Sequence, residues 1–496
     1  MSFKERQDGP RPDEGGRVGR RRTKHTRPRT LSEHDIAGYL FTCRHLHELA
    51  DELEPFHGVG RPLEIAPVVA LVFEGLAARK GTSQREVVLK HSAGWVWRHY
   101  CEIVRSAYPD EPRLWLPEKP PTRSQLRYWL DTRLIDDYSL AIFKRALEDV
   151  AVQISALLGI GKQHRDSVSH PTLDVGFTGD ATYLRGMYNT SYDEAIDKET
   201  GEFRTQRFDP DAKKIQQDKG YPGYRMTHVS AHNGHDREEL VYAIDITPGQ
   251  HGSDATAFLD MALAVYPLLP GMRTVTYDGA MHPVHIDRAL SAGLIAINHV
   301  QLTAKGEVAR FNIGEHTFTT RSGGKHTAVV TFVDGTPCVT VATAEDRHEV
   351  QLARRQNKRR PNADGTYTFY GTWAYPDEPI VPAHLRGATT LIRFNSTDDE
   401  IATGRRRTRA GRVIPAGDPD FPVTYGGRNN TENRHHQLKI GLPNKRLNVC
   451  GINRVRRRLI AHFFTKNLEA ALAWHERTGG DIRHLFAQPP PVADAA

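Results

Sequence analysis

The spacing of apolar residues changes twice along this chain of 496 residues, and each change predicts a different kind of structure. From about Leu31 to Gly161, apolar residues recur at helical intervals of three and four. Helix starts are marked by Ser83 with Glu86 and by Thr122 with Gln125, because both pairs have the spacing of a capping box. The first third of the chain is therefore predicted to be helical.

After Thr172 the apolar pattern becomes that of β-strands. The segments Leu173 to Leu184, Tyr224 to Ala231 and Leu240 to Ile246 are predicted strands, the third a nearly continuous apolar run of the kind found in buried sheets. Helix and strand then alternate over Ser253 to Leu268, Thr274 to Tyr277, His282 to Ala292 and Leu294 to His299. Three strands followed by this alternation predict an α/β layer with a central sheet.

Residues 303–419 interrupt the alternation with short strand-like runs separated by Gly, Pro, Asn and Asp. The runs are Phe311 to Thr319, Ala328 to Phe332, Cys338 to Ala342, Tyr367 to Tyr375 and Thr389 to Phe394. Helical character returns at Arg428 and continues through Asn453 to His475. We therefore expect a helical domain (31–165), an α/β core (166–302 plus 420–480), a β-rich insertion (303–419) and a flexible tail (481–496).

Residues 1–30 hold ten Lys or Arg against four Asp or Glu, which leaves about +1 of the net charge of +7 for the rest of the chain. This basic tail is expected to be disordered until it meets a polyanion. Further basic clusters lie at Arg354, Arg355, Lys358, Arg359 and Arg360, at Arg405, Arg406, Arg407, Arg409 and Arg412, and at Arg454, Arg456, Arg457 and Arg458. They favour a DNA-processing enzyme, although each cluster alone also fits a solvated loop.

The apolar runs and cysteines bear on location and redox state. No run approaches the ~18 apolar residues of a membrane span, and the N-terminal arginines precede no apolar segment of a secretory signal. A cytoplasmic protein with no membrane partner is expected. Buried, reduced thiols are expected at Cys43, Cys101, Cys338 and Cys450, since they are far apart in sequence. Zinc chemistry at His435 and His436 or at His282 and His285 is a lesser alternative.

Three acids lie at the ends or middles of predicted elements, where they could hold divalent cations. Asp180 lies on the first predicted strand, Asp278 ends the fourth, and Glu432 falls in the late helix. Carboxylates from separate elements can hold the two cations that phosphodiester chemistry uses. Asp174 competes with Asp180 for this role, and Asp278 before Gly279 also fits an ordinary turn.

The segment from Tyr425 to Lys439 has a Y-x2-R-x3-E-x6-K pattern. On a helix that advances ~100° per residue, the tyrosine, Arg428, Glu432 and the lysine fall within roughly 60° of arc. One acid would then share a face with two cations and a phenol, as suits a group that holds a metal ion beside a phosphate. Taken alone, the same face fits a solvated helix surface with ordinary charge pairs.

The order of these elements, the Asp-x-Thr of the first strand, the Asp that closes the fourth and the Tyr-Arg-Glu-Lys helix together resemble a DDE transposase of bacterial insertion sequences. The similarity extends over about Thr172 to Ala473 and includes the Pro-Gly and Ser-Asp pairs between Ile246 and Asp254. It implies an RNase H-like core in which Asp180, Asp278 and Glu432 bind two Mg²⁺ ions, for which Mn²⁺ can substitute. It also implies that Tyr425, Arg428 and Lys439 contact DNA phosphates near the transposon end.

Two details qualify the resemblance. Gly279-Ala280-Met281 follows the second Asp, where the family often has an aromatic-containing run. In some relatives the insertion presents an aromatic side chain that stacks on a flipped base, and Trp373 is the candidate here, with core packing as the alternative.

The resemblance implies Mg²⁺-dependent strand cleavage and strand transfer at terminal inverted repeats. The N-terminal helices would bind these ends, with Arg123 and Arg127 on a candidate recognition helix. Two copies would pair the ends as a homodimer acting on transposon and target DNA, in the nucleoid of the cytoplasm. The alternatives are a transposase-derived DNA-binding protein that lacks the chemistry and a nuclease that shares the fold.

Overall fold

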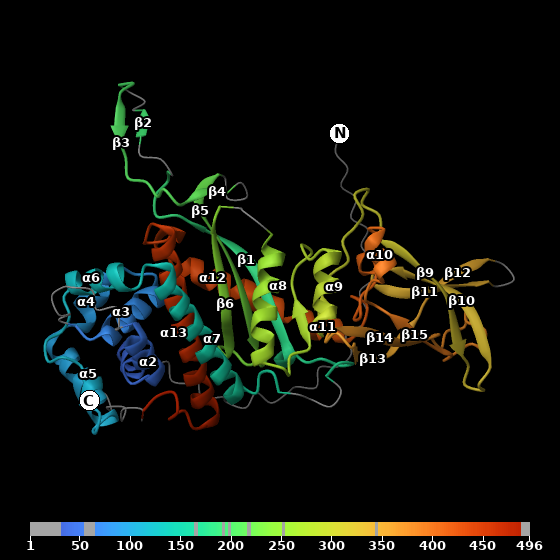
Figure 1. Cartoon of the computed structure of the whole chain (residues 1–496), viewed down its shortest axis with the longest axis horizontal. Coiled ribbons are helices and arrows are strands. Elements are labelled where there is room, and N and C mark those ends of the chain that lie inside the picture. Colours follow the sequence, from blue (N-terminus) through green and yellow to red (C-terminus); the bar gives the residue numbers. More distant parts are fainter. Residues whose placement is uncertain are drawn as a thin grey trace, which may run out of the picture.

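The computed structural model describes residues 31–53, 65–162, 167–190, 194–196, 200–215, 220–249, 253–342 and 346–487. Within these residues the chain is a mixed α/β protein, as predicted (Figure 1). Helices gather at one end of an elongated molecule, a sheet crosses its middle, and a second sheet forms the other end. The basic segment 1–30, predicted to be disordered, lies outside the described residues.

The N-terminal part is helical, as its apolar spacing predicts. Its helices are α1 (Glu33–Phe41), α2 (Arg44–Leu53), α3 (Pro67–Lys80), α4 (Gln84–His91), α5 (Gly94–Ala107), α6 (Arg123–Arg133) and α7 (Asp137–Leu158). Thr122 forms a complete capping box with Gln125 at the start of α6. At the start of α4, the Ser83 hydroxyl accepts a hydrogen bond from the Glu86 N–H. Both predicted helix starts are therefore confirmed.

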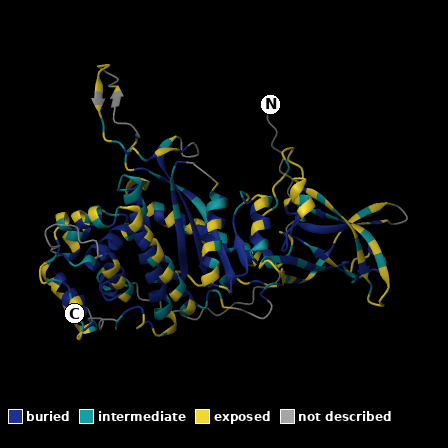
Figure 2. Ribbon diagram, in the orientation of Figure 1, coloured by how far each residue is buried: buried dark blue, intermediate teal, exposed yellow. Residues whose placement is uncertain are grey.

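The central sheet contains β1 (Gly176–Arg185), β4 (Lys213–Ile215), β5 (Tyr221–His232), β6 (Glu239–Pro248), β7 (Thr274–Thr276) and β8 (Ile295–Ile297). Its order is β6-β5-β1-β7-β8, with β4 paired to the start of β5. Strand β5 runs antiparallel to both β1 and β6, whereas β7 runs parallel to β1 and β8. Nearly all residues of β5 and β6 are buried, which explains their continuous apolar runs (Figure 2).

Helices cover both faces of β1. Successive residues of a strand face opposite sides, so neighbouring residues of β1 identify the helix on each face. On one face, a side chain at Gly179 would collide with Phe258 of α8 (Asp254–Val265). On the other, a Cβ at Gly427 of α12 (Gly427–Gly441) would lie 2.8 Å from Thr178 Cγ2. Helices α8 and α12 therefore enclose the middle of β1, with Asp180 on the α12 side.

The N-terminal helices share the core of the central sheet. Both α7 and α13 (Ile452–Thr478) pack against β6, and α13 also packs against α3. The side chain of Asn467 exchanges hydrogen bonds with the backbone N–H and C=O of Val241, at 2.9 and 2.7 Å. This bond pair covers the edge of β6, where unpaired backbone groups would otherwise be exposed.

The second sheet is antiparallel and lies within residues 303–419 (Figure 1). Its order is β12-β11-β10-β9-β15-β14-β13. The strands are β9 (Arg310–Thr319), β10 (Lys325–Val333), β11 (Thr336–Ala342), β12 (Arg347–Gln351), β13 (Ala353–Pro361), β14 (Tyr367–Ala374) and β15 (Thr389–Arg393). The short helices α10 (Asp398–Ala402) and α11 (Asp420–Tyr425) follow this sheet in the chain, and the helix α9 (Pro283–Ser291) of the core packs against β14. The apolar pattern predicted five of these strands and missed the charged strands β12 and β13.

Two other elements differ from the prediction. A hairpin of β2 (Glu194–Ile196) and β3 (Phe203–Thr205) extends away from the body between β1 and β4 (Figure 1). Residues 481–487, predicted to begin a flexible tail, instead pack against the first helices, where the Phe486 ring lies 5.5 Å from that of Tyr39. Their apolar side chains Leu485 and Phe486 are fully buried. Residues 488–496 lie outside the described part.

Among the residues that the structure describes, no helix has both the length and the apolar character needed to cross a bilayer. The four cysteines are free thiols, of which Cys43, Cys101 and Cys338 are buried and Cys450 is half-buried.

Candidate active site

Asp180 and Asp278 lie on neighbouring parallel strands. Thr178 of β1 pairs in register with Thr276 of β7, so each aspartate lies two residues beyond a paired residue, at the same level of the sheet. The carboxylate of Asp180 is 15% exposed and faces α12. The structure therefore brings together two acids that are 98 positions apart in sequence.

The electrostatics of Asp278 reflect that proximity. Burial raises the pKa of Asp278, and the negative charges of Asp180 and Asp254 raise it further. The Ala280 N–H donates to its Oδ1 at 2.8 Å, so Asp278 also has the turn role that its position before Gly279 indicates. An acid that is half-buried beside another acid gains from a cation that neutralises both.

Glu432 joins this pair through Arg428. On α12, Arg428 Nη1 lies 2.8 Å from Glu432 Oε1, and Nη2 lies 3.9 Å from Asp180 Oδ1. Burial lowers the pKa of Arg428, but the charges of Asp180, Tyr425 and Glu432 outweigh that effect and raise it. The guanidinium thus links the carboxylates of a strand and a helix.

Tyr425 and Lys439 complete the Tyr-Arg-Glu-Lys pattern, but not on one uninterrupted helix. Tyr425 ends α11, and α12 begins after Gly426, whose backbone angles (φ −57°, ψ −25°) remain helical. The Tyr425 ring stacks on Phe421 at 5.0 Å and meets the edge of His299 at 4.9 Å. Lys439 is half-buried in the last turn of α12.

The competing acid Asp174 lies in a short 3-10 turn before β1 rather than on the strand. Its charge acts on the pKa of His232 rather than on that of Asp278. Asp180 is therefore the acid of this segment that lies beside Asp278.

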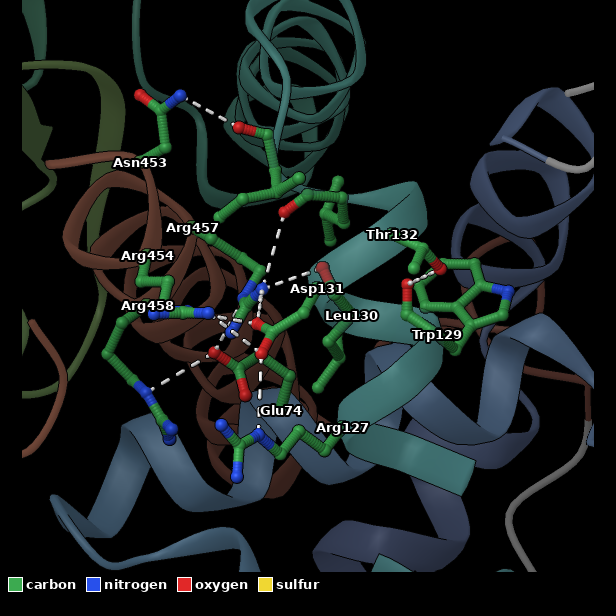
Figure 3. Close-up of polar contacts among 12 residues, drawn as sticks. Glu74, Arg127, Trp129, Leu130, Asp131, Thr132, Asn453, Arg454, Arg457 and Arg458 are labelled. Atoms are coloured by element: carbon green, nitrogen blue, oxygen red, sulfur yellow. Dashed lines mark hydrogen bonds and ion pairs between the residues drawn. The ribbon is translucent and has the colours of Figure 1, made fainter. Parts of the chain in front are cut away.

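Arg123 and Arg127 lie on exposed positions of α6, while Leu126, Trp129 and Leu130 are buried, as the alternative of an amphipathic surface helix predicted. Arg127 is 67% exposed and pairs with Asp131 at 3.5 Å. Figure 3 shows that Asp131 also meets Arg454 and Arg457, so α6 is joined to α13 by ion pairs.

Three arginines of two basic clusters are buried, although Arg355, Lys358 and Arg360 of the same clusters are exposed. Arg457 and Arg458 are almost completely buried and share the fully buried Glu74 of α3 (Figure 3). Arg354 of β13 is 4% exposed and donates to both carboxylate oxygens of Asp418 at 2.7 Å. These three side chains pair with acids distant in sequence and do not face solvent, while the prediction that the clusters favour a DNA-processing enzyme stays a prediction.

The third basic cluster, at 405–412, is also largely engaged with the protein. Arg406 pairs with Asp287 at 2.8 Å, and Arg407 pairs with Glu400 at 2.8 Å. Arg412 is buried and donates to backbone carbonyls, and burial lowers its pKa to about 10. These arginines hold the segment after β15 against α9 and α10.

Trp373 is 1% exposed in β14, where it packs near Phe394 with ring centroids 6.2 Å apart. It is a core residue, as the alternative to base stacking predicted. Of the two histidine pairs in the zinc alternative, His282 and His285 have structural contacts: His285 accepts from the His282 N–H at 3.1 Å, and its other ring nitrogen lies 3.0 Å from Thr256 Oγ1.

Sequence reasoning gave four residues no role beside the acids, namely His435, His228, Tyr277 and Asp254. His435 of α12 lies 3.5 Å from Asp180, and its second ring nitrogen lies 3.0 Å from His228. Tyr277, before Asp278, is buried, and burial together with the charges of Asp254, Asp180 and Asp278 raises its pKa. A helical count from Glu432 could have placed His435 beside the acids, and Tyr277 directly precedes Asp278 in sequence. The place of His228 depends on strand pairing, and that of Asp254 depends on the packing of α8 against β1.

The donor chemistry of the site suits Mg²⁺, which prefers carboxylate oxygens. Within the described part of the chain, no three His, Cys, Asp or Glu side chains converge closely enough to hold a metal ion. At the candidate site, the guanidinium of Arg428 contacts Glu432 and lies close to Asp180. Asp180 and Asp278 supply two carboxylates at one level of neighbouring strands, and Arg428 lies between Asp180 and Glu432.

A scan against models of protein families finds no match to this chain. A search of curated proteins likewise finds no relative.

Proposed function

We propose that this protein is a DNA transposase of the DDE class that cleaves and joins DNA strands at the terminal inverted repeats of an insertion sequence. The observation that carries the proposal is the linked set Asp180, Asp278 and Glu432, contributed by two parallel strands and a helix, with Arg428 between two of the acids. Phosphoryl transfer by two metal ions uses carboxylates from separate elements to hold the ions.

The topology of the central sheet supports an RNase H-like core. Three antiparallel strands are followed by two parallel ones, and the acids lie on the first strand and directly after the fourth strand of that order. The second sheet occupies the place of the β-rich insertion that the resemblance implies.

Asp180, Asp278 and Glu432 would hold two Mg²⁺ ions, with Mn²⁺ as a substitute. When bound, these ions activate the attacking water or 3′-hydroxyl and stabilise the leaving oxygen. When no metal ion is bound, Arg428 neutralises the acids. It is also placed to meet a phosphate beside Glu432. Tyr425 and Lys439 flank it on the same helical path and would position the DNA backbone.

The other parts of the chain would serve binding. Exposed Arg123 and Arg127 would place α6 on the double-stranded DNA of a transposon end. Two copies of the chain would pair two ends as a homodimer before transfer to target DNA. The location that follows is the nucleoid of the cytoplasm.

The test is Mg²⁺-dependent strand cleavage and joining on DNA that carries the imperfect inverted repeats flanking the coding region. The wild-type chain is expected to cut and join these ends. Asp278→Ala and Glu432→Ala should abolish both steps, while His436→Ala, an exposed neighbour on α12, should retain them. Full activity in either acid variant would contradict the proposal, and cleavage without joining would identify a nuclease instead.

A further inference from the structure

His435 connects the candidate site to the interior of the sheet. It follows Glu432 by three positions on α12, roughly 20° beyond the arc that the Tyr-Arg-Glu-Lys residues share. Its side chain is 7% exposed. Nδ1 lies 3.5 Å from Asp180 Oδ2, and Nε2 lies 3.0 Å from Nδ1 of His228.

His228 closes the inner end of this contact. It is the cross-strand partner of Asp180 in the β1–β5 pairing, so both side chains lie on the face that α12 covers. The ring is fully buried and stacks on Phe463 of α13, with centroids 5.9 Å apart. Its outer nitrogen, Nε2, has no hydrogen-bond partner among the described residues.

The carboxylate of Asp180 fixes which ring nitrogen of His435 carries the hydrogen. An ionised carboxylate accepts and does not donate, so a neutral His435 must present its N–H at Nδ1 to face Asp180. Nε2 of His435 then carries the lone pair and accepts from the Nδ1–H of His228. One tautomer of each ring satisfies both contacts, whereas the opposite tautomer of His435 would aim a lone pair at the carboxylate.

We propose that His435, backed by His228, is a positioning residue that orients the carboxylate of Asp180 for metal binding. The inference rests on the proposed function of the site. The two oxygens of Asp180 have different neighbours, since Oδ2 faces His435 and Oδ1 faces Arg428. With Oδ2 restrained, rotation of the carboxylate about its Cβ–Cγ bond is limited, and Asp180 presents a fixed oxygen to the cation. Partners that orient ligating carboxylates in this way typically contribute 10- to 100-fold to metal affinity.

Three substitutions separate positioning from packing. His435→Asn keeps an N–H two bonds beyond Cβ, where Nδ1 lies, and so keeps the donor toward Asp180. His435→Gln places its amide oxygen three bonds beyond Cβ, where Nε2 lies, and so keeps only the acceptor toward His228. His435→Ala removes both, and His436→Ala is the matched control at an exposed position of the same helix.

The experiment is calorimetric titration of the full chain with Mn²⁺ in the absence of DNA. His435→Ala and His435→Gln are expected to bind Mn²⁺ about 10- to 100-fold more weakly than the wild type. His435→Asn should recover most of the affinity, and His436→Ala should match the wild type. In the strand-joining assay, kcat should fall in the Ala and Gln variants while KM for DNA stays unchanged.

Wild-type affinity in His435→Ala would overturn the inference, as would equal affinities in the Asn and Gln variants. Since Asn and Gln are both polar and similar in size to histidine, their comparison stands even if His435→Ala fails to fold. A wild-type chain that binds Mn²⁺ through its acids but joins no DNA would contradict the proposed function alone. No acid-dependent binding in the wild type would overturn both.

Discussion

Replacing Glu74 by leucine should destabilise the protein strongly, because this one carboxylate compensates two buried guanidinium groups (Figure 3). Glu74 is fully buried, and its Oε1 lies 3.2 Å from Arg457 Nε and 3.3 Å from Arg458 Nε. Burial raises the pKa of Glu74, but the charges of Arg458 and Arg457 outweigh that effect and lower it. Glu74 is therefore ionised in the folded protein.

The size of the stability loss depends on which partners Arg457 and Arg458 retain after Glu74 is removed. Arg457 retains Asp131 at 3.3 Å and the Leu130 carbonyl at 2.7 Å. Arg458 has no hydrogen-bond partner for Nε or Nη1 and would be left as a buried, uncompensated charge. Breaking such a pair from one side costs about 3–5 kcal/mol. With roughly 2.1 cal/mol/K of unfolding entropy per residue, the chain of 496 residues should lose about 3–5 °C in Tm.

The assay is thermal unfolding of Glu74→Leu, Arg458→Leu and the double variant. The double variant removes both charges and should lie within about 1–2 kcal/mol of the wild type, because well-packed apolar replacements of a buried ion pair are close to neutral. The cost of Glu74→Leu should shrink at acidic pH, since the stability from a lowered carboxyl pKa is lost as pH falls. Either single variant being as stable as the wild type at neutral pH would refute this reasoning. A stability loss in the double variant equal to the sum of the two single losses would refute it as well.

Further predictions concern Asp278 and α6. Asp278→Asn should raise stability at pH 7 by about 0.5–2 kcal/mol, since the raised pKa of Asp278 makes its ionised form unfavourable in the folded state. Thermal unfolding should show the gain narrowing as pH falls toward 4, where the wild-type carboxyl becomes protonated; an equal gain at both pH values would contradict it. Added Mg²⁺ should raise the Tm of the wild type and not that of Asp278→Asn. Arg123→Ala should weaken binding to end DNA and lower the slope of log affinity against log salt by about one, while an unchanged slope would exclude a phosphate contact.

The sequence predicted the buried strands well, because strands covered on both faces are apolar throughout. The runs Tyr224 to Ala231 and Leu240 to Ile246 fall within β5 and β6. Strand β13 was missed because it is rich in arginine and lysine, and its inward-facing Arg354 is neutralised by Asp418, 64 positions later. No local pattern contains such a partner.

The acids of the candidate site were predicted by type and order, but their geometry was not. That Asp180 and Asp278 lie at one level depends on the parallel register of β1 and β7, which helix α8 and its connections set. His435 lies three positions after Glu432 on α12, and a search over a slightly wider arc of that helix would have included it. His228 could not have been found, since its place beside Asp180 comes from strand pairing.

The most direct test of the candidate site is anomalous scattering from crystals of the full chain soaked in Mn²⁺. The wild type is expected to show an anomalous peak within ligand distance of both Asp180 and Asp278, with Glu432 released from Arg428 toward it. Asp278→Asn crystals should lack that peak under the same conditions. Saturating Mn²⁺ with no peak at these carboxylates, or an unchanged peak in Asp278→Asn, would contradict a metal-dependent site built from these acids.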